Sequence, residues 1–164
     1  MKIEKLENKD LIRVQEIAKL TWPDTFKEIL SSNQIDYMLN WMYNVETLSQ
    51  QNDEGHSFYI LKNEGIDIGF IGIQNDYPII GETKLHKIYV LPSAQGLGAG
   101  KLLMSKGEKL AKENKSTHLV LNVNRFNKAT DFYLKLGFEI SHEEDIDIGN
   151  GFLMEDYVMK KRLS

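Results

Sequence analysis

Cysteine is absent from this 164-residue sequence. Its absence excludes disulfide bonds, cysteine nucleophiles and thiolate metal sites, and it fits a reducing compartment such as the cytoplasm. The four histidines are dispersed along the chain without H-x-x-x-H or HExxH spacing. We therefore expect no metal cofactor.

Long apolar runs and an excess of positive charge are also missing. No run approaches the roughly 18 apolar residues of a membrane span, and charges interrupt residues 1–17, so a signal peptide is not expected. The 20 Lys and Arg residues against 24 Asp and Glu residues give a net charge of -4. That balance predicts no general attraction to nucleic acid or to an anionic membrane. We expect a cytoplasmic protein without either partner.

The length and composition are those of one globular domain, which we place at residues 1–164. Hydrophobic residues make up 41% of the chain and charged residues 27%, an ordinary balance for a packed core. There are only three prolines, and no repeat or flexible linker divides the sequence.

The spacing of apolar residues predicts an α/β fold. Helical spacing dominates near the N-terminus, and alternation begins at about residue 57. We expect strands at 2–6, 57–62, 66–74, 83–91, 117–123, 138–148 and 152–161, and helices at 11–20, 34–43, 45–52, 98–114 and 127–137. This order predicts a mixed central sheet of about six to seven strands, flanked by helices, with a parallel step through the long helix.

The segment "QGLGAGK" at 95–101 places glycines directly before a predicted helix, which is typical of an anion site. A P-loop would require glycine at Gln95 and a hydroxyl side chain at Leu102. A dinucleotide fingerprint would require its third glycine one residue after Gly100. The spacing therefore disagrees with both nucleotide motifs.

The spacing that fits is Q-x-x-G-x-G, formed by Gln95, Gly98 and Gly100. Glycines allow the backbone to approach a bulky phosphate, and the free N–H groups of the first helical turn point towards it. Gln95 can donate to a phosphate oxygen, and Lys101 adds positive charge. Taken alone, the segment could also be an ordinary turn that caps a helix.

Two separated motifs, "IYVLPSAQGLGAGKLLM" and "NKATDFYLKLGF", resemble the acetyl-CoA-binding core of the GCN5-related N-acetyltransferases, the GNAT family. The resemblance covers about residues 65–160. It implies a GNAT fold whose sheet is splayed after the fourth strand. Within the family, "LTWPDTFKEIL" and "FLMEDYVMKK" are similar to the branch that includes the bacterial polyamine (spermine/spermidine) acetyltransferases.

The resemblance implies which residues bind acetyl-CoA. The pantetheine would pair with the backbone of the strand at Ile88, Tyr89 and Val90, where a bulge and the splay leave polar groups free. The pyrophosphate would bind to Gln95, Gly96, Leu97, Gly98, Ala99, Gly100 and Lys101. Asn127 would bind the pantetheine or the pyrophosphate, and capping of its own helix is the alternative.

The resemblance also implies a proton donor and a base. Tyr133 would donate a proton to the departing thiolate, since a phenol keeps its proton at neutral pH. Polyamine-type relatives often have a glutamate as base at the position of His86. A histidine there could relay a proton from the acceptor ammonium, and Glu82 is the reserve base.

The acceptor amine would lie against the helices near the N-terminus. The residues implied there are Trp22, Asp24, Phe26, Tyr37 and Trp41, and Tyr77 is a further candidate. Aromatic faces with nearby carboxylates suit an amine cation. For Tyr37 and Trp41 the helical spacing equally fits packing in the core.

We therefore predict an acetyl-CoA-dependent N-acetyltransferase in which a primary amine attacks the thioester directly. The expected acceptor is a small molecule such as a polyamine. A protein N-terminal or lysine acetyltransferase and a non-catalytic acetyl-CoA-binding sensor are the alternatives. Family habit also implies a homodimer.

Overall fold

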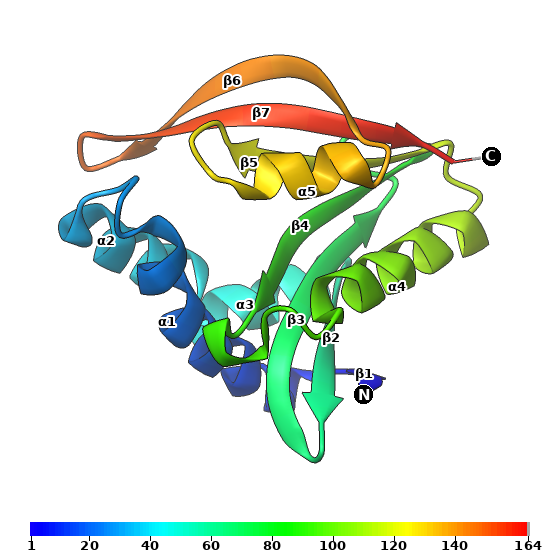
Figure 1. Ribbon diagram of the computed structural model, residues 1–164, viewed down its shortest axis with the longest axis horizontal. Helices are drawn as coiled ribbons and strands as arrows, with labels where there is room; N and C mark the ends of the chain where they lie inside the picture. Colours follow the sequence, from blue (N-terminus) through cyan, green and yellow to red (C-terminus); the bar gives the residue numbers. More distant parts are fainter. Residues whose placement is uncertain (164) are drawn as a thin grey trace.

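The computed structural model describes residues 1–163, so Ser164, the last residue of the predicted domain, lies outside the described residues. Three helices follow the first strand, three strands come next, and two further helices separate the remaining strands (Figure 1). In order they are β1 (Lys2–Lys5), α1 (Ile12–Phe26), α2 (Ser32–Met42), α3 (Val45–Asp53), β2 (His56–Asn63), β3 (Ile66–Asn75), β4 (Glu82–Val90), α4 (Ala99–Glu113), β5 (His118–Asn124), α5 (Ala129–Lys135), β6 (Glu139–Gly149) and β7 (Phe152–Arg162).

The strands form one seven-stranded mixed sheet with the order β1-β2-β3-β4-β5-β7-β6. Neighbouring strands are antiparallel except at the centre, where β4 and β5 are parallel and α4 makes the crossover between them. The predicted α/β class and mixed sheet are confirmed. Among residues 1–163, no helix is long and apolar enough to cross a membrane.

The sheet splays between its two central strands, as predicted. In the described structure β4 and β5 pair through four residue pairs, from Glu82 with His118 to Leu85 with Leu121. His86 then forms a bulge, because it has no partner in β3: Gly72 pairs with Lys87, and the next residue, Ile73, pairs with Leu85. After this bulge β5, β6 and β7 turn away from β4 (Figure 1). The β5-facing edge of residues 86–90 therefore has no partner strand in the part of the chain that the structure describes.

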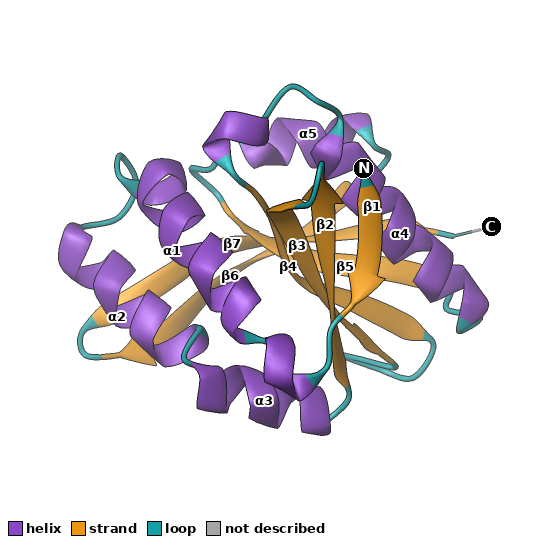
Figure 2. Cartoon of the chain, turned by 90° about the horizontal axis from the view of Figure 1, so that it is seen from below, coloured by secondary structure: helices purple, strands orange, loops and turns teal. Residues whose placement is uncertain are grey.

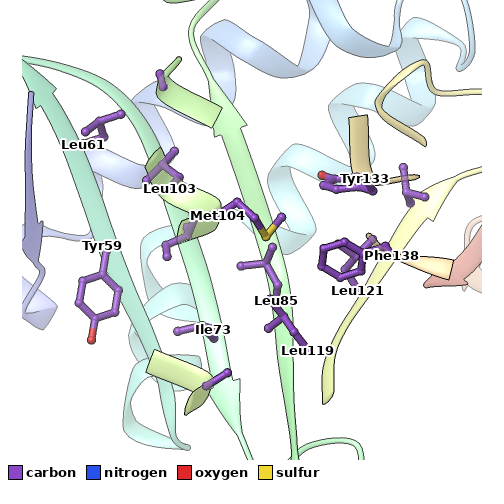
Figure 3. Packing of buried hydrophobic residues seen from close by; sticks show 14 of the residues in the cluster. Tyr59, Leu61, Ile73, Leu85, Leu103, Met104, Leu119, Leu121, Tyr133 and Phe138 are labelled. Atoms are coloured by element: carbon purple, nitrogen blue, oxygen red, sulfur yellow. The ribbon is translucent and has the colours of Figure 1, made fainter. Parts of the chain in front are cut away.

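Helices cover both faces of the sheet, with α1, α2 and α3 on one side and α4 and α5 on the other (Figure 2). Each face has its own cluster of buried apolar residues. Leu85, Leu103 and Met104 lie in the cluster under α4, and Tyr133 and Phe138 lie at its β5 side (Figure 3). The other cluster includes Trp22 and Phe26. The splayed ends of β4 and β5 lie between these two clusters.

Helix α1 extends six residues beyond the predicted end at residue 20. Pro23 lies inside the helix, although proline normally ends one because it lacks an N–H donor. Thr21, Trp22 and Phe26 are all buried and continue the apolar stripe of the helix. Packing of these side chains outweighs the lost backbone bond, because tertiary contacts supply most helical stability.

A lysine is buried on the α3 side of the sheet. Lys87 is 5% exposed, its Nζ donates to Oε1 of Gln51 at 3.1 Å, and the ring centroids of Tyr43 and Phe58 lie 5.5 and 5.9 Å from Nζ. Burial lowers the pKa of Lys87 to about 8. Because the unfolded chain holds this proton up to a higher pH, Lys87 contributes a rise in stability between about pH 8 and its ordinary pKa of about 10.4.

We expect Lys87→Met to raise the free energy of unfolding by roughly 1 to 3 kcal/mol at pH 7, because it removes a buried charge at the expense of weaker ring and amide contacts. The gain should shrink at pH 10, where the wild-type lysine is neutral when folded. Denaturant unfolding at both pH values measures this difference in stability.

Lys106→Met is the control. Nζ of Lys106 also lies over a ring, at 5.2 Å from the centroid of Tyr59, but the side chain is only half-buried. A less stable Lys87→Met at pH 7 would contradict the prediction.

Candidate active site

A cavity of about 1090 Å³ occupies the splay between β4 and β5. Its walls come from the ends of β4 and β5, the starts of α4 and α5, the end of α1, and parts of α2 and β7. The cavity thus brings together residues far apart in the sequence. The predicted residues that line it are Trp22, Asp24, Phe26, His86, Ile88, Tyr89, Val90, Gln95, Gly96, Gly98, Ala99, Gly100, Lys101, Asn127 and Tyr133.

One end of the cavity is formed by the glycine turn, residues 95–101. Gly96 and Gly98 have φ values of 85° and 80°, which L side chains rarely adopt, so the turn requires glycine for its conformation. The first hydrogen bond of α4 joins N–H of Leu102 to the carbonyl of Gly98 at 3.1 Å. The N–H groups of residues 99–101 precede it, have no partner among residues 1–163, and can bind an anion at the positive end of the helix dipole.

The free edge of β4 runs from the bulge at His86 towards the glycine turn. Ile88 and Val90 pack against the cluster under α4, while Tyr89 packs on the other side, 5.7 Å from Trp22 and 5.8 Å from Phe70 between ring centroids. The side chains of these residues are therefore packed on the two faces of the sheet. Their backbone groups on the β5 side have no strand partner and can bind a ligand. A pyrophosphate at the helix start and an extended chain of amides along this edge both suit these groups.

Asn127 lines the cavity at the start of α5. Its side-chain Oδ1 accepts a hydrogen bond from N–H of Ala129 at 2.9 Å, and its carbonyl accepts one from Oγ1 of Thr130 at 3.1 Å. The oxygens of Asn127 therefore bind the first turn of the helix, although Lys128 is the N-cap residue. The Nδ2 amide is the group left to donate to a ligand.

Tyr133 of α5 is 7% exposed and lines the cavity. Its ring is held by Phe132 and Phe138, with centroids at 5.4 and 5.9 Å. Burial raises the pKa of Tyr133 above its ordinary value of about 10, so the hydroxyl keeps its proton at neutral pH. This is the protonation state that a proton donor requires.

His86 lines the cavity but lies in a crowded pocket. Its Nε2 is 2.9 Å from Oε1 of Gln74, and its ring stacks on His56 at 4.3 Å and lies 5.2 Å from the ring of Tyr77. Burial, with the nearby His56 and two lysines, lowers the pKa of His86 to about 2. The ring is thus neutral at physiological pH and a weak base, which is unfavourable for the predicted role.

Glu82 lies at the other end of β4 and does not line the cavity. It is 4% exposed, and Oε2 accepts a hydrogen bond from Nζ of Lys160 at 3.0 Å. The structure therefore places the two predicted bases at different locations, and the reserve base is occupied by an ion pair.

The predicted acceptor residues divide into two groups. Trp22, Asp24 and Phe26 line the cavity from α1. Tyr37 and Trp41 stack on one another at 6.2 Å outside it, and neither they nor Tyr77 belong to its lining. Leu97 of the glycine turn is also outside the lining and is 52% exposed.

Sequence reasoning missed a buried acid in the cavity wall. Asp156 of β7 is 2% exposed, and Oδ2 accepts a hydrogen bond from Nδ2 of Asn122 at 3.2 Å. Both residues line the cavity. Alternation along "FLMEDYVMKK" was the available signal, since it places Asp156 on the same face as the apolar Met154 and Val158. Among residues 1–163, no group of three or more His, Asp or Glu side chains is arranged to hold a metal ion.

Comparison with known proteins identifies the family. Residues 26–161 match the family described as "Acetyltransferase (GNAT) domain". The chain is 28% identical over 165 residues to the spermidine N(1)-acetyltransferase of Thermoplasma acidophilum, covering 94% of this chain and 96% of that relative. It is 32% identical over 116 residues to the [ribosomal protein bS18]-alanine N-acetyltransferase of Haemophilus influenzae, covering 69% of this chain and 74% of that relative.

A solved structure agrees with this relationship. The crystal structure of the PaiA N-acetyltransferase from Thermoplasma acidophilum, in complex with coenzyme A, superimposes with a TM-score of 0.80 at 28% identity and covers 99% of this chain and all of that one. The chain belongs to the GNAT family of acetyltransferases. It is an N-acetyltransferase that uses acetyl-CoA as the acetyl donor, and the free N–H groups of residues 99–101 and the open edge of β4 suit that donor.

Proposed function

We propose that this N-acetyltransferase acetylates a small polyamine, with spermidine as the representative acceptor. The observation that supports this most directly is the nearly full-length similarity to a spermidine N(1)-acetyltransferase. The distribution of charge in the cavity agrees with it. Lys101 and Lys128 come from the glycine turn and the residue before α5, whereas the acidic residues of the lining, Asp24, Glu28 and Asp156, come from α1, the turn after it and β7. Lys27 also lines the cavity on the α1 side, where its Nζ pairs with Oδ1 of Asp24 at 3.7 Å, so acids still outnumber cations there. A polycation would favour the acidic side.

The closure of the acceptor side also favours a small molecule. Tyr37 of α2 donates a hydrogen bond to the carbonyl of Ile148 at 2.6 Å, and Gln34 donates one to the carbonyl of Leu153 at 2.8 Å. These bonds hold the β6–β7 hairpin against α2 (Figure 1). Gln34 and Leu153 line the cavity, so these bonds limit the space on its acceptor side, which suits a small amine better than an extended peptide.

Protein N-terminal acetylation is the second candidate, because one relative acts on the alanine of ribosomal protein bS18. A thiol-release assay with spermidine and with a hexapeptide that begins with alanine separates the two. We expect turnover with spermidine and none with the peptide. The reverse result would contradict the polyamine proposal.

Propylamine is the matched control for charge recognition. It offers a primary amine on a three-carbon chain, as the N1 end of spermidine does, but lacks the further cations of spermidine. We expect a lower kcat/KM for propylamine, because the acidic lining attracts the extra charges. Equal values would show that those charges are not recognised.

Within this function we propose Tyr133 as the proton donor to the sulfur that leaves acetyl-CoA. The raised pKa of its buried hydroxyl and its place in the cavity wall support the role. The predicted homodimer and cytoplasmic location stay predictions.

A further inference from the structure

Asp156 faces the acceptor side of the splay. It pairs in register with Asn124 across β5 and β7. Side chains alternate along a strand, so Asp156 shares its face with Met154, which packs in the cluster of α1 and α2. Its neighbour Tyr157 packs on the opposite face, in the cluster that contains Tyr133. The sheet thus presents an acid to the acceptor side, while the Tyr133 cluster lies on the other face.

The surroundings of Asp156 leave one carboxylate oxygen available. Oδ2 accepts the hydrogen bond from Asn122, whose Oδ1 in turn accepts one from Nζ of Lys84. Arg125 donates to the backbone carbonyl of Asp156 at 3.1 Å and is paired with acids of β6 and β7. Among the described residues, no donor is bonded to Oδ1. This oxygen can therefore accept a proton from a molecule in the cavity.

The charged groups around Asp156 act in both directions. Burial raises its pKa most strongly, and Glu144 of β6 also raises it, while Asn122, Lys84 of β4 and Arg125 lower it. The net effect is a pKa above the ordinary value of an aspartate. A carboxylate with a raised pKa holds a transferred proton better, which brings it closer to the range of an efficient base.

We propose that Asp156 is the general base that takes a proton from the ammonium of the acceptor. This inference rests on the proposed small-amine acetylation and names the residue that activates its nucleophile. Oδ1 of Asp156 takes one proton, which leaves a neutral amine on the acceptor side of the cavity. The amine nitrogen bonds to the acetyl carbonyl carbon, the carbon–sulfur bond breaks, and the sulfur takes the proton of Tyr133. The surplus proton on nitrogen returns to the Tyr133 oxygen, and Asp156 releases its proton to solvent.

The test compares Asp156→Asn with the wild type in a thiol-release assay from pH 6.5 to 9.5. The acceptor is spermidine or the alanine-initiated hexapeptide, whichever the wild type acetylates. We expect kcat/KM of the variant to fall about a hundredfold or more at pH 7. With spermidine it should then rise about tenfold per pH unit, because only acceptor that arrives as free amine reacts; with the peptide the rise should level off above about pH 8, where the α-amino group is already neutral. The kcat/KM of the wild type should vary much less between pH 6.5 and 9.5.

Glu144→Gln is the matched control. Glu144 is an acid that accepts a hydrogen bond from the same Nδ2 of Asn122, at 3.3 Å, but it is exposed. Because Glu144 is only a minor cause of the raised pKa of Asp156, we expect kcat/KM to change only slightly and the pH profile to keep its wild-type shape. Calorimetry supplies a readout independent of turnover: Asp156→Asn should bind coenzyme A as the wild type does, which also reports an intact fold.

Three results would overturn the assignment. One is an Asp156→Asn variant with the wild-type pH profile. Another is the rising profile in His86→Gln and not in Asp156→Asn, which would assign the proton transfer to His86. A third is a loss of coenzyme A binding by Asp156→Asn, which would make its role structural. A wild type that acetylates neither acceptor would instead overturn the proposed function itself.

Discussion

Tyr133→Phe is expected to lower kcat by about two orders of magnitude or more, the usual contribution of a positioned acid. The substitution removes one oxygen and keeps the ring between Phe132 and Phe138. Among residues 1–163, no hydrogen bond to the Tyr133 hydroxyl is present, so its loss leaves no partner unsatisfied. Stability and the affinity for acetyl-CoA should therefore change little. Steady-state turnover and calorimetric titration with coenzyme A measure the two quantities.

Tyr59→Phe is the control for this prediction. Tyr59 is 8% exposed and belongs to the same cluster, yet it lies on the far side of the cluster from Tyr133 (Figure 3). It does not line the cavity. Its variant should turn over at the wild-type rate. Unchanged turnover in Tyr133→Phe across the pH range would remove that hydroxyl from the mechanism.

Gly98→Val should reduce the affinity for acetyl-CoA about a hundredfold or more. Gly98 has a φ of 80° and supplies the carbonyl that begins α4. A β-branched side chain is strongly disfavoured in this conformation, so the turn must change shape and the N–H groups of residues 99–101 must turn away. Each hydrogen bond to a charged group is worth about 1.5–3 kcal/mol, and the loss of two such bonds gives this reduction. Calorimetric titration with acetyl-CoA measures it.

Gly65→Val separates strain from binding. Gly65 has the same φ of 80°, and a Cβ atom there would meet nothing within 4 Å. It lies in the turn between β2 and β3, away from the cavity lining. This variant should be destabilised by backbone strain, of order 1–3 kcal/mol, yet bind acetyl-CoA normally. Wild-type affinity in Gly98→Val would show that the glycine turn does not hold the donor.

Local patterns were sufficient to predict the glycine turn and the helix after it. The positive φ of Gly96 and Gly98, the free N–H groups of the first turn and the amphipathic spacing of α4 all arise within about 20 consecutive residues. The seven strands could be predicted for the same reason, because alternation is a local signal. The prediction ended α1 at residue 20, six residues too early, since packing of Trp22 and Phe26 with distant residues continues that helix past Pro23.

Contacts between distant segments decided what could not be predicted. The bulge at His86 depends on the pairing of β4 with β3, and the burial of that histidine depends on His56 of β2. Asp156 enters the cavity because β7 pairs with β5 and the splay opens beside them. The family resemblance implied a bulge in this strand, but not the burial of His86. Alternation placed Asp156 on an apolar face, but nothing local showed that this face borders the cavity. Tyr37 was chosen for its aromatic character, but its hydroxyl holds the β6–β7 hairpin instead of lining the cavity.

The short junction between β4 and β5 has a consequence for the geometry of the reaction. The glycine turn follows the β4 half of the sheet, and Tyr133 follows the β5 half. With four residue pairs joining the halves, the angle between them is set largely by the side chains that pack across the junction, such as Leu85 and Leu121. The position of the glycine turn relative to Tyr133 therefore depends on the volume of the apolar side chains that pack between the two halves. Selection for a fast reaction would act on these apolar side chains as well as on the polar groups that perform the chemistry.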